Sequence, residues 1–218
     1  MRVRVVVAFV ATTACSDDTA TNANGDVARV SFVNGFGADV DLLIDGEVHA
    51  SNVAIGAVTL LDLPVGARDI AVREAGSSAA TSLTTQVMAH ATAPIAALRG
   101  SGGALVVRAL EDSSAVVPPD ATKLRVLHLA ARAGEVQVWR TQPDYQTPIR
   151  WAFPFVYNSV NSYYQSSPGT WEVRVWTDSA TSWTTAVNAA RLTLLGGGKK
   201  TVAILDRPAG GIKLEVID

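Results

Sequence analysis

Histidines can transfer protons or bind metals near neutral pH, and this chain has three of them. His49, His90 and His128 lie far apart in sequence and form no His-x-x-x-His pair or other metal-ligand spacing. We expect each at a strand end or turn, bonded to backbone atoms. His128 is the best of the three for a catalytic role, but Asn34 stands at its place in the first half of the chain. An asparagine there favours a hydrogen bond in a turn over proton transfer.

Carboxylates and glycine-rich segments are the next places to look for chemistry. Asp39, Asp41 and Asp45 alternate with apolar residues and are expected on a solvated strand face, with weak Ca²⁺ binding as the alternative. The segment 198–201, Gly-Lys-Lys-Thr, lacks the spacing of a phosphate loop and precedes an expected strand rather than a helix. Ser101, between two glycines, fits a hairpin better than a nucleophile elbow. We therefore expect no catalytic residue, no metal and no cofactor; a hydrolase is the remaining enzymatic alternative.

Aromatic residues are distributed unevenly. All five Trp and all four Tyr lie between Trp139 and Trp183. Side chains alternate across a strand, so if Val173 and Val175 face a core, Trp176 faces outward. Trp139 faces outward by the same count.

Outward aromatic rings could form a platform on which sugar rings stack, or an apolar patch for a partner protein. The alternative is that the rings are covered by a neighbouring domain, by a linker or by each other. The predicted ligand-binding residues are Trp139, Trp176, Tyr163 and Tyr164.

The first residues have the parts of an export signal. Residues 1–4 are basic, residues 5–11 are all apolar, and Thr-Thr-Ala precedes Cys15. This junction resembles a bacterial lipoprotein processing site, which predicts a signal peptide over 1–14 and a lipid on Cys15. A plain signal peptide or a first strand are the alternatives. Residues 15–26 are polar and are expected to form a flexible tether.

This reading places the mature protein in the cell envelope, anchored by its lipid. Ser16 resembles the signal that sends such lipoproteins to an outer membrane, in a host that has one. No stretch approaches 18 consecutive apolar residues, so no membrane-spanning helix is expected. The single cysteine excludes an internal disulfide and a cysteine-cage zinc site. A net charge of −2, with 17% charged residues, argues against a nucleic-acid partner.

The rest of the chain divides into two similar halves. The segment 64–73 matches 167–176, and 102–112 matches 210–218, each pair being a turn followed by a strand. Each half has about seven short β-branched segments separated by Gly, Pro, Asn or Asp. The predicted fold is all-β: two tandem antiparallel β-sandwiches, immunoglobulin-like or transthyretin-like, over 27–114 and 122–218, with a proline-containing linker over 115–121. The alternative is one larger sandwich or barrel whose halves share a core.

These segments resemble a bacterial exported repeat, the domain of unknown function 4397. In the first half the resemblance runs through Phe32-Val33-Asn34, Val40 to Gly46, Val53 to Val58 and Pro64-Val65-Gly66. In the second half it runs through Arg125 to His128, Tyr157 to Val160 and Pro168 to Trp171, although Arg140 stands where an Asp-Gly turn is expected. The family implies an exported β-domain, often lipid-anchored, with no established activity and no catalytic residues.

The expected function is therefore binding or adhesion at the cell envelope. A glycan or envelope polymer is the first expectation for the ligand, and the aromatic second half is the expected binding half. A structural or assembly protein that binds an envelope protein is the alternative, with a hydrolase as the third.

Overall fold

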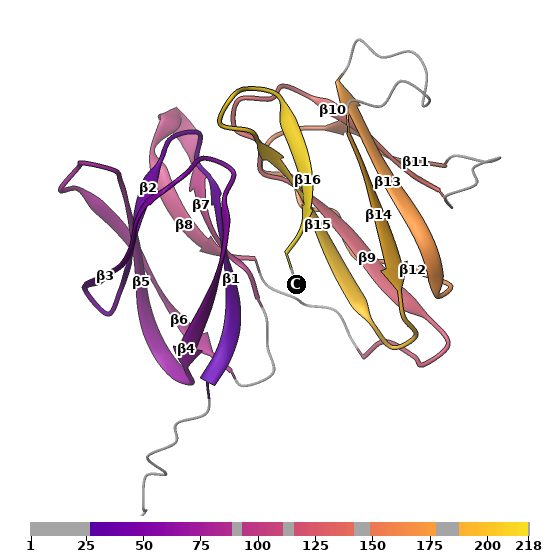
Figure 1. The fold of residues 1–218 in the computed structure, drawn as a ribbon, viewed down its shortest axis with the longest axis horizontal. Helices are drawn as coiled ribbons and strands as arrows, with labels where there is room; N and C mark the ends of the chain where they lie inside the picture. Colours follow the sequence, from indigo (N-terminus) through magenta and orange to yellow (C-terminus); the bar gives the residue numbers. More distant parts are fainter. Residues whose placement is uncertain (1–26, 89–92, 111–115, 142–148, 178–187, 218) are drawn as a thin grey trace, which may run out of the picture.

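The computed structural model describes residues 27–88, 93–110, 116–141, 149–177 and 188–217. These residues form two β-sandwiches that lie side by side, the first eight strands in one and the last eight in the other (Figure 1). The single helical element among them is a 3-10 turn at Ser101–Gly103. The predicted all-β class of β-sandwich domains is confirmed.

The first sandwich consists of two four-stranded sheets, in the orders β4-β1-β7-β8 and β3-β2-β5-β6. Its strands are β1 (Val27–Gly35), β2 (Val40–Ile44), β3 (Glu47–Val53), β4 (Val58–Pro64), β5 (Gly66–Glu74), β6 (Ala80–Val87), β7 (Ile95–Arg99) and β8 (Leu105–Ala109).

The second sandwich repeats this arrangement with the sheets β12-β9-β15-β16 and β11-β10-β13-β14. Its strands are β9 (Thr122–His128), β10 (Val136–Thr141), β11 (Ile149–Phe155), β12 (Tyr164–Ser166), β13 (Gly169–Thr177), β14 (Asn188–Leu194), β15 (Lys199–Asp206) and β16 (Ile212–Val216). Strand n of the first sandwich thus corresponds to strand n+8 of the second.

The strand pairing departs in one respect from a purely antiparallel sandwich. β1 pairs with β7 in parallel, and β9 pairs with β15 in parallel, while every other pair of these strands is antiparallel. The chain reverses where the sequence predicted turns. Asp45 and Gly46 both adopt positive φ between β2 and β3, and glycine pairs at 102–103 and 210–211 do the same before the last strand of each sandwich.

Each sandwich encloses its own apolar core, so the alternative of one shared core is wrong. The first core contains Phe32, Leu42 and Ile70, all fully buried. The second contains Val126, Val138 and Val175, also fully buried. Burial of these aliphatic and aromatic side chains between two sheets is the main driving force for each sandwich.

A third apolar cluster joins the two sandwiches. It lies between the outer face of the β1–β7 sheet and the outer face of the β9–β15 sheet, which face each other in Figure 1. Its buried members are Val33, Ala96, Leu98, Leu110, Leu127, Leu129, Ala203, Leu205 and Ile217. Because these side chains are at most 4% exposed, the interface is as well buried as either core.

Hydrogen bonds complete the contact between the sandwiches. The Tyr157 hydroxyl donates to the carbonyl oxygen of Gly35 (2.9 Å) and accepts from the backbone N–H of Arg99 (2.6 Å). The Arg132 guanidinium donates to the carbonyl oxygen of Gly37 through Nε (3.2 Å) and Nη2 (3.0 Å). Apolar packing and these bonds together fix the relative orientation of the two sandwiches.

Some predicted features lie outside the described residues. These are the signal peptide, Cys15, the tether to residue 26, His90 and Trp183. Within the described part of the chain, no helix has the length and apolar character needed to cross a membrane.

Candidate ligand-binding site

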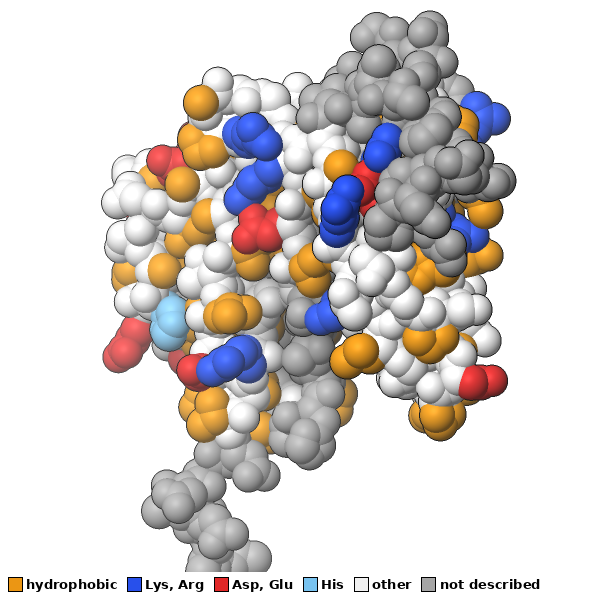
Figure 2. Space-filling view, turned by 45° about the vertical axis from the view of Figure 1, so that its right-hand side comes forward, with side chains coloured by type: hydrophobic (Ala, Val, Ile, Leu, Met, Phe, Trp, Pro, Cys, Tyr) orange, Lys and Arg blue, Asp and Glu red, His pale blue; other side chains and the backbone are white. Residues whose placement is uncertain are grey.

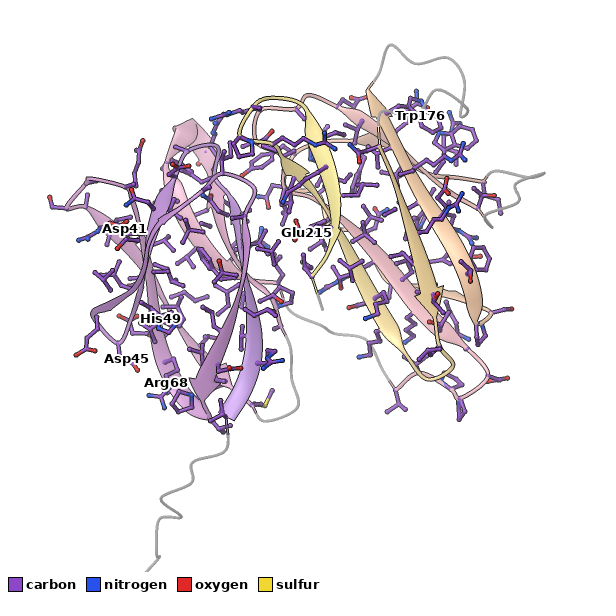
Figure 3. The ribbon with its side chains drawn as sticks, viewed as in Figure 1. Asp41, Asp45, His49, Arg68, Trp176 and Glu215 are labelled. Carbon is purple, nitrogen blue, oxygen red and sulfur yellow. The ribbon has the colours of Figure 1, made fainter. Side chains whose placement is uncertain are left out.

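Trp139 and Trp176 lie next to each other on the outer face of the sheet that contains β10 and β13. Val138 and Val175 point to the opposite face and into the core, as the alternation predicted. The two indole rings stack with centroids 5.1 Å apart and planes inclined by 20°. Trp176, labelled in the upper part of the second sandwich in Figure 3, is only 1% exposed. The outward position of Trp176 is confirmed, but its ring is covered, in part because Trp139 stacks on it, which is the alternative in which the rings cover each other.

The two indole N–H groups differ. Nε1 of Trp139 donates to Oε1 of Gln137 (3.4 Å). Nε1 of Trp176 is buried and has no acceptor among the described residues. A buried, unpaired N–H of this kind costs about 1–3 kcal/mol, so Trp176 acts as a packing residue despite that cost. Of this pair only Trp139, which is half-buried, keeps surface for a ligand.

Tyr163 and Tyr164 are adjacent in sequence but point to different places. The Tyr163 hydroxyl lies 3.1 Å from Oγ1 of Thr201, and the Arg125 guanidinium lies 4.7 Å from the Tyr163 ring centre. These contacts lie on the outer face of the β9–β15 sheet, so the Tyr163 ring packs against protein groups there. Tyr164 begins β12 at the edge of that sheet and is 40% exposed. The four predicted ring residues are thus divided among three places.

Tyr164 lines a pocket of about 490 Å³ between the edges of the two sheets of the second sandwich. Arg140 from β10, Trp171 from β13 and Ile149 from β11 contribute the opposite wall. The remaining lining residues are Asp120, Ala121, Gln165, Ser166 and Ser167. The pocket is open to solvent, and its lining combines two aromatic rings with several polar and charged groups that a ligand can contact.

Local structure fixes the pocket walls. β12 pairs with β9, which places Tyr164 opposite Leu124. Nε1 of Trp171 donates to the carbonyl oxygen of Ser167 (3.1 Å), so the indole ring folds back over the turn that precedes β13. Trp151 meets Tyr164 edge-on at 6.2 Å between ring centres. Three aromatic rings from three strands therefore gather at this end of the sandwich.

Arg140 and Trp171 are pocket residues that the sequence prediction missed. Arg140 lies on the inward face of β10 with Val136 and Val138, although inward positions are ordinarily apolar. The arginine at an inward position was the signal available in the sequence. Trp171 alternates with Val173 and Val175 along β13, so it packs against the core while its ring also reaches the pocket.

Charges on the outer face of β13 are paired. Glu172 is 3% exposed and accepts hydrogen bonds from Nε of Arg174 and Nε of Arg191. Burial alone would raise the pKa of Glu172, but the two arginines outweigh it and hold that pKa below its usual value. The charge of Glu172 is thus balanced by Arg174 and Arg191. Glu172 lies on the opposite face of the sheet from Arg140 and does not contact it.

His128 is fully buried, and both of its ring nitrogens bond to the backbone. The N–H of Ala130 donates to Nδ1 (3.4 Å), which assigns the ring proton to Nε2 and lets Nε2 donate to the carbonyl oxygen of Gly134 (3.0 Å). Burial lowers the pKa of His128, which keeps the ring neutral. The expected turn-forming hydrogen bond is confirmed. His49 is an exposed residue of β3.

The aspartates of the first sandwich hold backbone and arginine groups. Asp39 accepts from the N–H of Ile55 (3.0 Å), and Asp45 accepts from the N–H of Asp69 (3.0 Å). Asp41 is 6% exposed, so the expectation of a solvated face is wrong at this position. Its carboxylate accepts from the N–H of Asn52 and from Arg73, and these two bonds lower its pKa. The described residues contain no group of three or more potential metal ligands.

The two glycine-containing segments are strand connections. Lys199 begins β15, so a strand follows Gly198 as predicted. Ser101 lies in the 3-10 turn that joins β7 to β8, as expected of a hairpin residue.

Comparison with known protein families finds a match to one family. The family model described as "Domain of unknown function (DUF4397)" matches residues 28–139, which is the first sandwich apart from Val27 and the second as far as Trp139 in β10. No curated protein matches the chain. One similar solved structure is a leucine-rich repeat protein from Bacteroides thetaiotaomicron, with 13% sequence identity and a TM-score of 0.21. The similarity covers 81% of this chain and 26% of that one, so the chain spans about a quarter of that protein's length.

Proposed function

The chain belongs to the DUF4397 family, and on that premise we propose that it is a non-catalytic binding protein of the cell envelope. It is exported, anchored through a lipid on Cys15, and binds a glycan or envelope polymer in the pocket of the second sandwich. The observation that carries this proposal is the pocket between the sheet edges, with Tyr164 and Trp171 in its walls.

The composition of the pocket supports binding of a sugar. Aromatic rings present flat apolar faces to the C–H groups of a sugar, and polar side chains around them bond its hydroxyl groups. Gln165, Ser166 and Ser167 supply such polar groups along the β12 side of the pocket. Tyr164 is accessible enough for a ligand to reach it from solvent.

The surface of the molecule bears on whether it docks a partner protein or binds a ligand in a pocket. On the side of the molecule shown in Figure 2, the apolar side chains of the described residues lie in small groups among polar atoms. A large contiguous apolar patch would mark a protein-docking surface, and this face has none among the described residues. This face therefore gives the assembly alternative no support.

The burial and hydrogen bonds of His128 support a function without catalysis. A general base needs a nitrogen that can reach the substrate, whereas both nitrogens of this buried ring bond to the backbone.

Binding is tested with the full chain carrying Cys15→Ser, which prevents lipidation, by calorimetric titration with soluble envelope polysaccharides. We expect saturable binding that Tyr164→Ala weakens about tenfold or more, since an aromatic wall of the site is lost. The matched control is Trp139→Ala, which removes a half-buried ring from the outer face and should leave affinity unchanged. Binding lost in Trp139→Ala but kept in Tyr164→Ala would reject the pocket, and no binding to any polymer would reject the proposed function.

The anchor is tested separately in cells of a bacterial host. Wild-type chain should incorporate radiolabelled palmitate and sediment with membranes, and Cys15→Ser should do neither. A wild-type chain that stays soluble and unlabelled would contradict the lipoprotein assignment.

A further inference from the structure

Arg140 is a buried cation whose side chain points inward. It lies on the core-facing side of β10 and is 6% exposed, yet it lines the pocket described above. Its place in the strand is set by pairing with Val173 of β13 on one side and Ile149 of β11 on the other. The backbone therefore fixes where this charge enters the sandwich.

The Arg140 guanidinium is held by aromatic rings. Its central carbon lies 3.7 Å from the Tyr164 ring centre and 5.5 Å from the Trp171 ring centre. Among the described residues, no carboxylate forms an ion pair with Arg140 and no acceptor takes a hydrogen bond from it. Cation–π contacts stabilise the charge, but they give no hydrogen-bond acceptor to the five N–H donors of the guanidinium, and no described residue supplies one.

The first sandwich carries a different residue at the position of Arg140. Ile44 stands there, because it pairs with Ile70 as Arg140 pairs with Val173. At this end of the first sandwich the cation is Arg68, which occupies the position that Trp171 has in the second sandwich.

Arg68 has the partners that Arg140 lacks. Its Nη1 donates to Oδ2 of Asp45 (3.0 Å), and its Nε donates to the carbonyl oxygen of Pro64 (3.1 Å). Figure 3 shows Asp45 and Arg68 close together at one end of the first sandwich. The residue of the second sandwich at the position of Asp45 is Thr141, which carries no charge. The sequence comparison that put Arg140 at the Asp-Gly turn was therefore wrong by one residue. Among the described residues, the second sandwich has the cation without a carboxylate to pair with it.

Burial of an unpaired charge is unfavourable, so this arrangement is suited to an anion that arrives from outside. The planar guanidinium fork matches a carboxylate in a bidentate geometry. Asp120 also lines the pocket, and its negative charge disfavours a multiply charged anion such as phosphate. The same carboxylate can accept hydrogen bonds from hydroxyl groups.

From this arrangement, and resting on the proposed function, we propose that the pocket binds an acidic sugar and that Arg140 bonds its carboxylate. A hexuronate ring has one carboxylate for Arg140, hydroxyl groups for Asp120 and the serines, and an apolar face for the aromatic walls. The unit comes either from a polyuronate chain or from a free sugar acid.

The test is calorimetric titration of the full chain carrying Cys15→Ser with tetragalacturonate. The fully methyl-esterified tetramer, which has the same rings without the charge, serves as the matched ligand. We expect the acid to bind at least about tenfold more tightly than the ester, as charge-assisted hydrogen bonds require. Galacturonic acid that binds as tightly as the tetramer would identify a single free sugar as the ligand, and weaker binding would identify the chain. Inorganic phosphate that competes as well as the tetramer would overturn the assignment to a sugar.

Two arginine variants locate the effect. Arg140→Gln should lose about tenfold or more in affinity for the acid and should bind acid and ester alike. Arg68→Gln, which removes the already paired cation of the first sandwich, should bind the acid as the parent does. Equal affinity of the parent for acid and ester, together with unchanged binding in Arg140→Gln, would overturn this proposal and leave the binding function standing. No binding of tetragalacturonate by a chain that still binds another envelope polymer would also overturn it, whereas no binding of any polymer would reject both proposals.

Stability provides an independent readout. Because Arg140 has no ionic partner among the described residues, Arg140→Gln should lose no more stability in urea than its cation–π contacts supply, about 2 kcal/mol at most. A loss well above that would reveal a partner that already neutralises the guanidinium, and it would overturn the proposal.

Discussion

Asn34 and His128 occupy the same position in the two sandwiches and close their first strands in the same way. The backbone of Asn34 pairs with Gly56 and Ala57 (2.8 and 2.9 Å), and that of His128 pairs with Asn158 and Ser159 (2.7 and 2.9 Å). Each side chain accepts from the N–H two residues further on, at Phe36 (3.1 Å) and Ala130 (3.4 Å). An amide and an imidazole thus perform one structural task, so the imidazole is replaceable in the fold.

His128 should make the protein less stable in mild acid. Because burial lowers its pKa below the ordinary value of 6.5, the folded protein binds fewer protons than the unfolded chain once the pH falls through that value. The free energy of unfolding should then decrease between pH 7 and pH 5. His128→Asn should reduce that decrease, as measured by urea denaturation at both pH values. The buried Asp206, whose pKa is raised, contributes with the opposite sign in both proteins. His49→Asn, at an exposed histidine, should keep the full decrease, and an unchanged decrease in His128→Asn would contradict the prediction.

Trp176 should be a stability residue. Trp176→Ala removes a ring that is 1% exposed, and we expect a loss of about 3–5 kcal/mol in the free energy of unfolding. Trp176→Phe should lose much less, because it also removes the unpaired indole N–H. Urea denaturation followed by circular dichroism measures both. A loss in Trp176→Ala no larger than that in Trp139→Ala would mean that the stacked pair is not a packed unit.

Gly56 should be essential for the contact between the sandwiches. A Cβ at this position would lie 1.9 Å from the carbonyl oxygen of Asp206, in the other sandwich. Gly46 also has positive φ, but nothing lies within 4 Å of its Cβ position, which makes it the matched control. Gly56→Ala should destabilise the protein by about 1–3 kcal/mol more than Gly46→Ala, since only the former forces the backbones apart. Small-angle X-ray scattering should show a larger radius of gyration for Gly56→Ala alone. Equal effects of the two substitutions would contradict the described contact.

Tyr157 should stabilise the same contact through its hydroxyl. Tyr157→Phe keeps the ring but leaves the carbonyl of Gly35 and the N–H of Arg99 without their partner. Gly35 is buried but Arg99 is exposed and can bond to water instead, so we expect a loss of about 1 kcal/mol, the usual net contribution of one hydrogen bond. Burial also raises the pKa of Tyr157 above its ordinary value of 10.0, so an alkaline absorbance titration should show a late component that Tyr157→Phe removes. A titration curve that Tyr157→Phe leaves unchanged at its alkaline end would contradict this.

Much of each sandwich could be predicted, because short sequence patterns indicate its turns and the faces of its strands. Asp45 and Gly46 marked a hairpin that positive φ confirms, and the alternation around Val173 assigned its neighbours to the correct faces. The third cluster was not predicted, because it depends on how whole sheets meet. Its trace in the sequence was strands with consecutive apolar residues, such as Ile95 to Leu98 and Val202 to Leu205, which is the pattern of sheets covered on both faces.

The candidate site was predictable only in part. Tyr164 was named and does line the pocket, but alternation could not show that Tyr163 turns to the outer face beside Thr201. The approach of Arg140 to Tyr164 joins strands of two different sheets, and such a contact follows from sheet packing rather than from spacing along the chain.

The interface between the sandwiches is self-complementary. Val33 and Leu127 are counterparts, as are Leu98 and Leu205, so the two surfaces that meet carry the same positions of one fold. Such a surface could equally pair with its own copy on another molecule. Because both partners here belong to one polypeptide, the pairing is intramolecular and does not depend on protein concentration. Covalent linkage therefore keeps these two faces covered by each other rather than by another molecule.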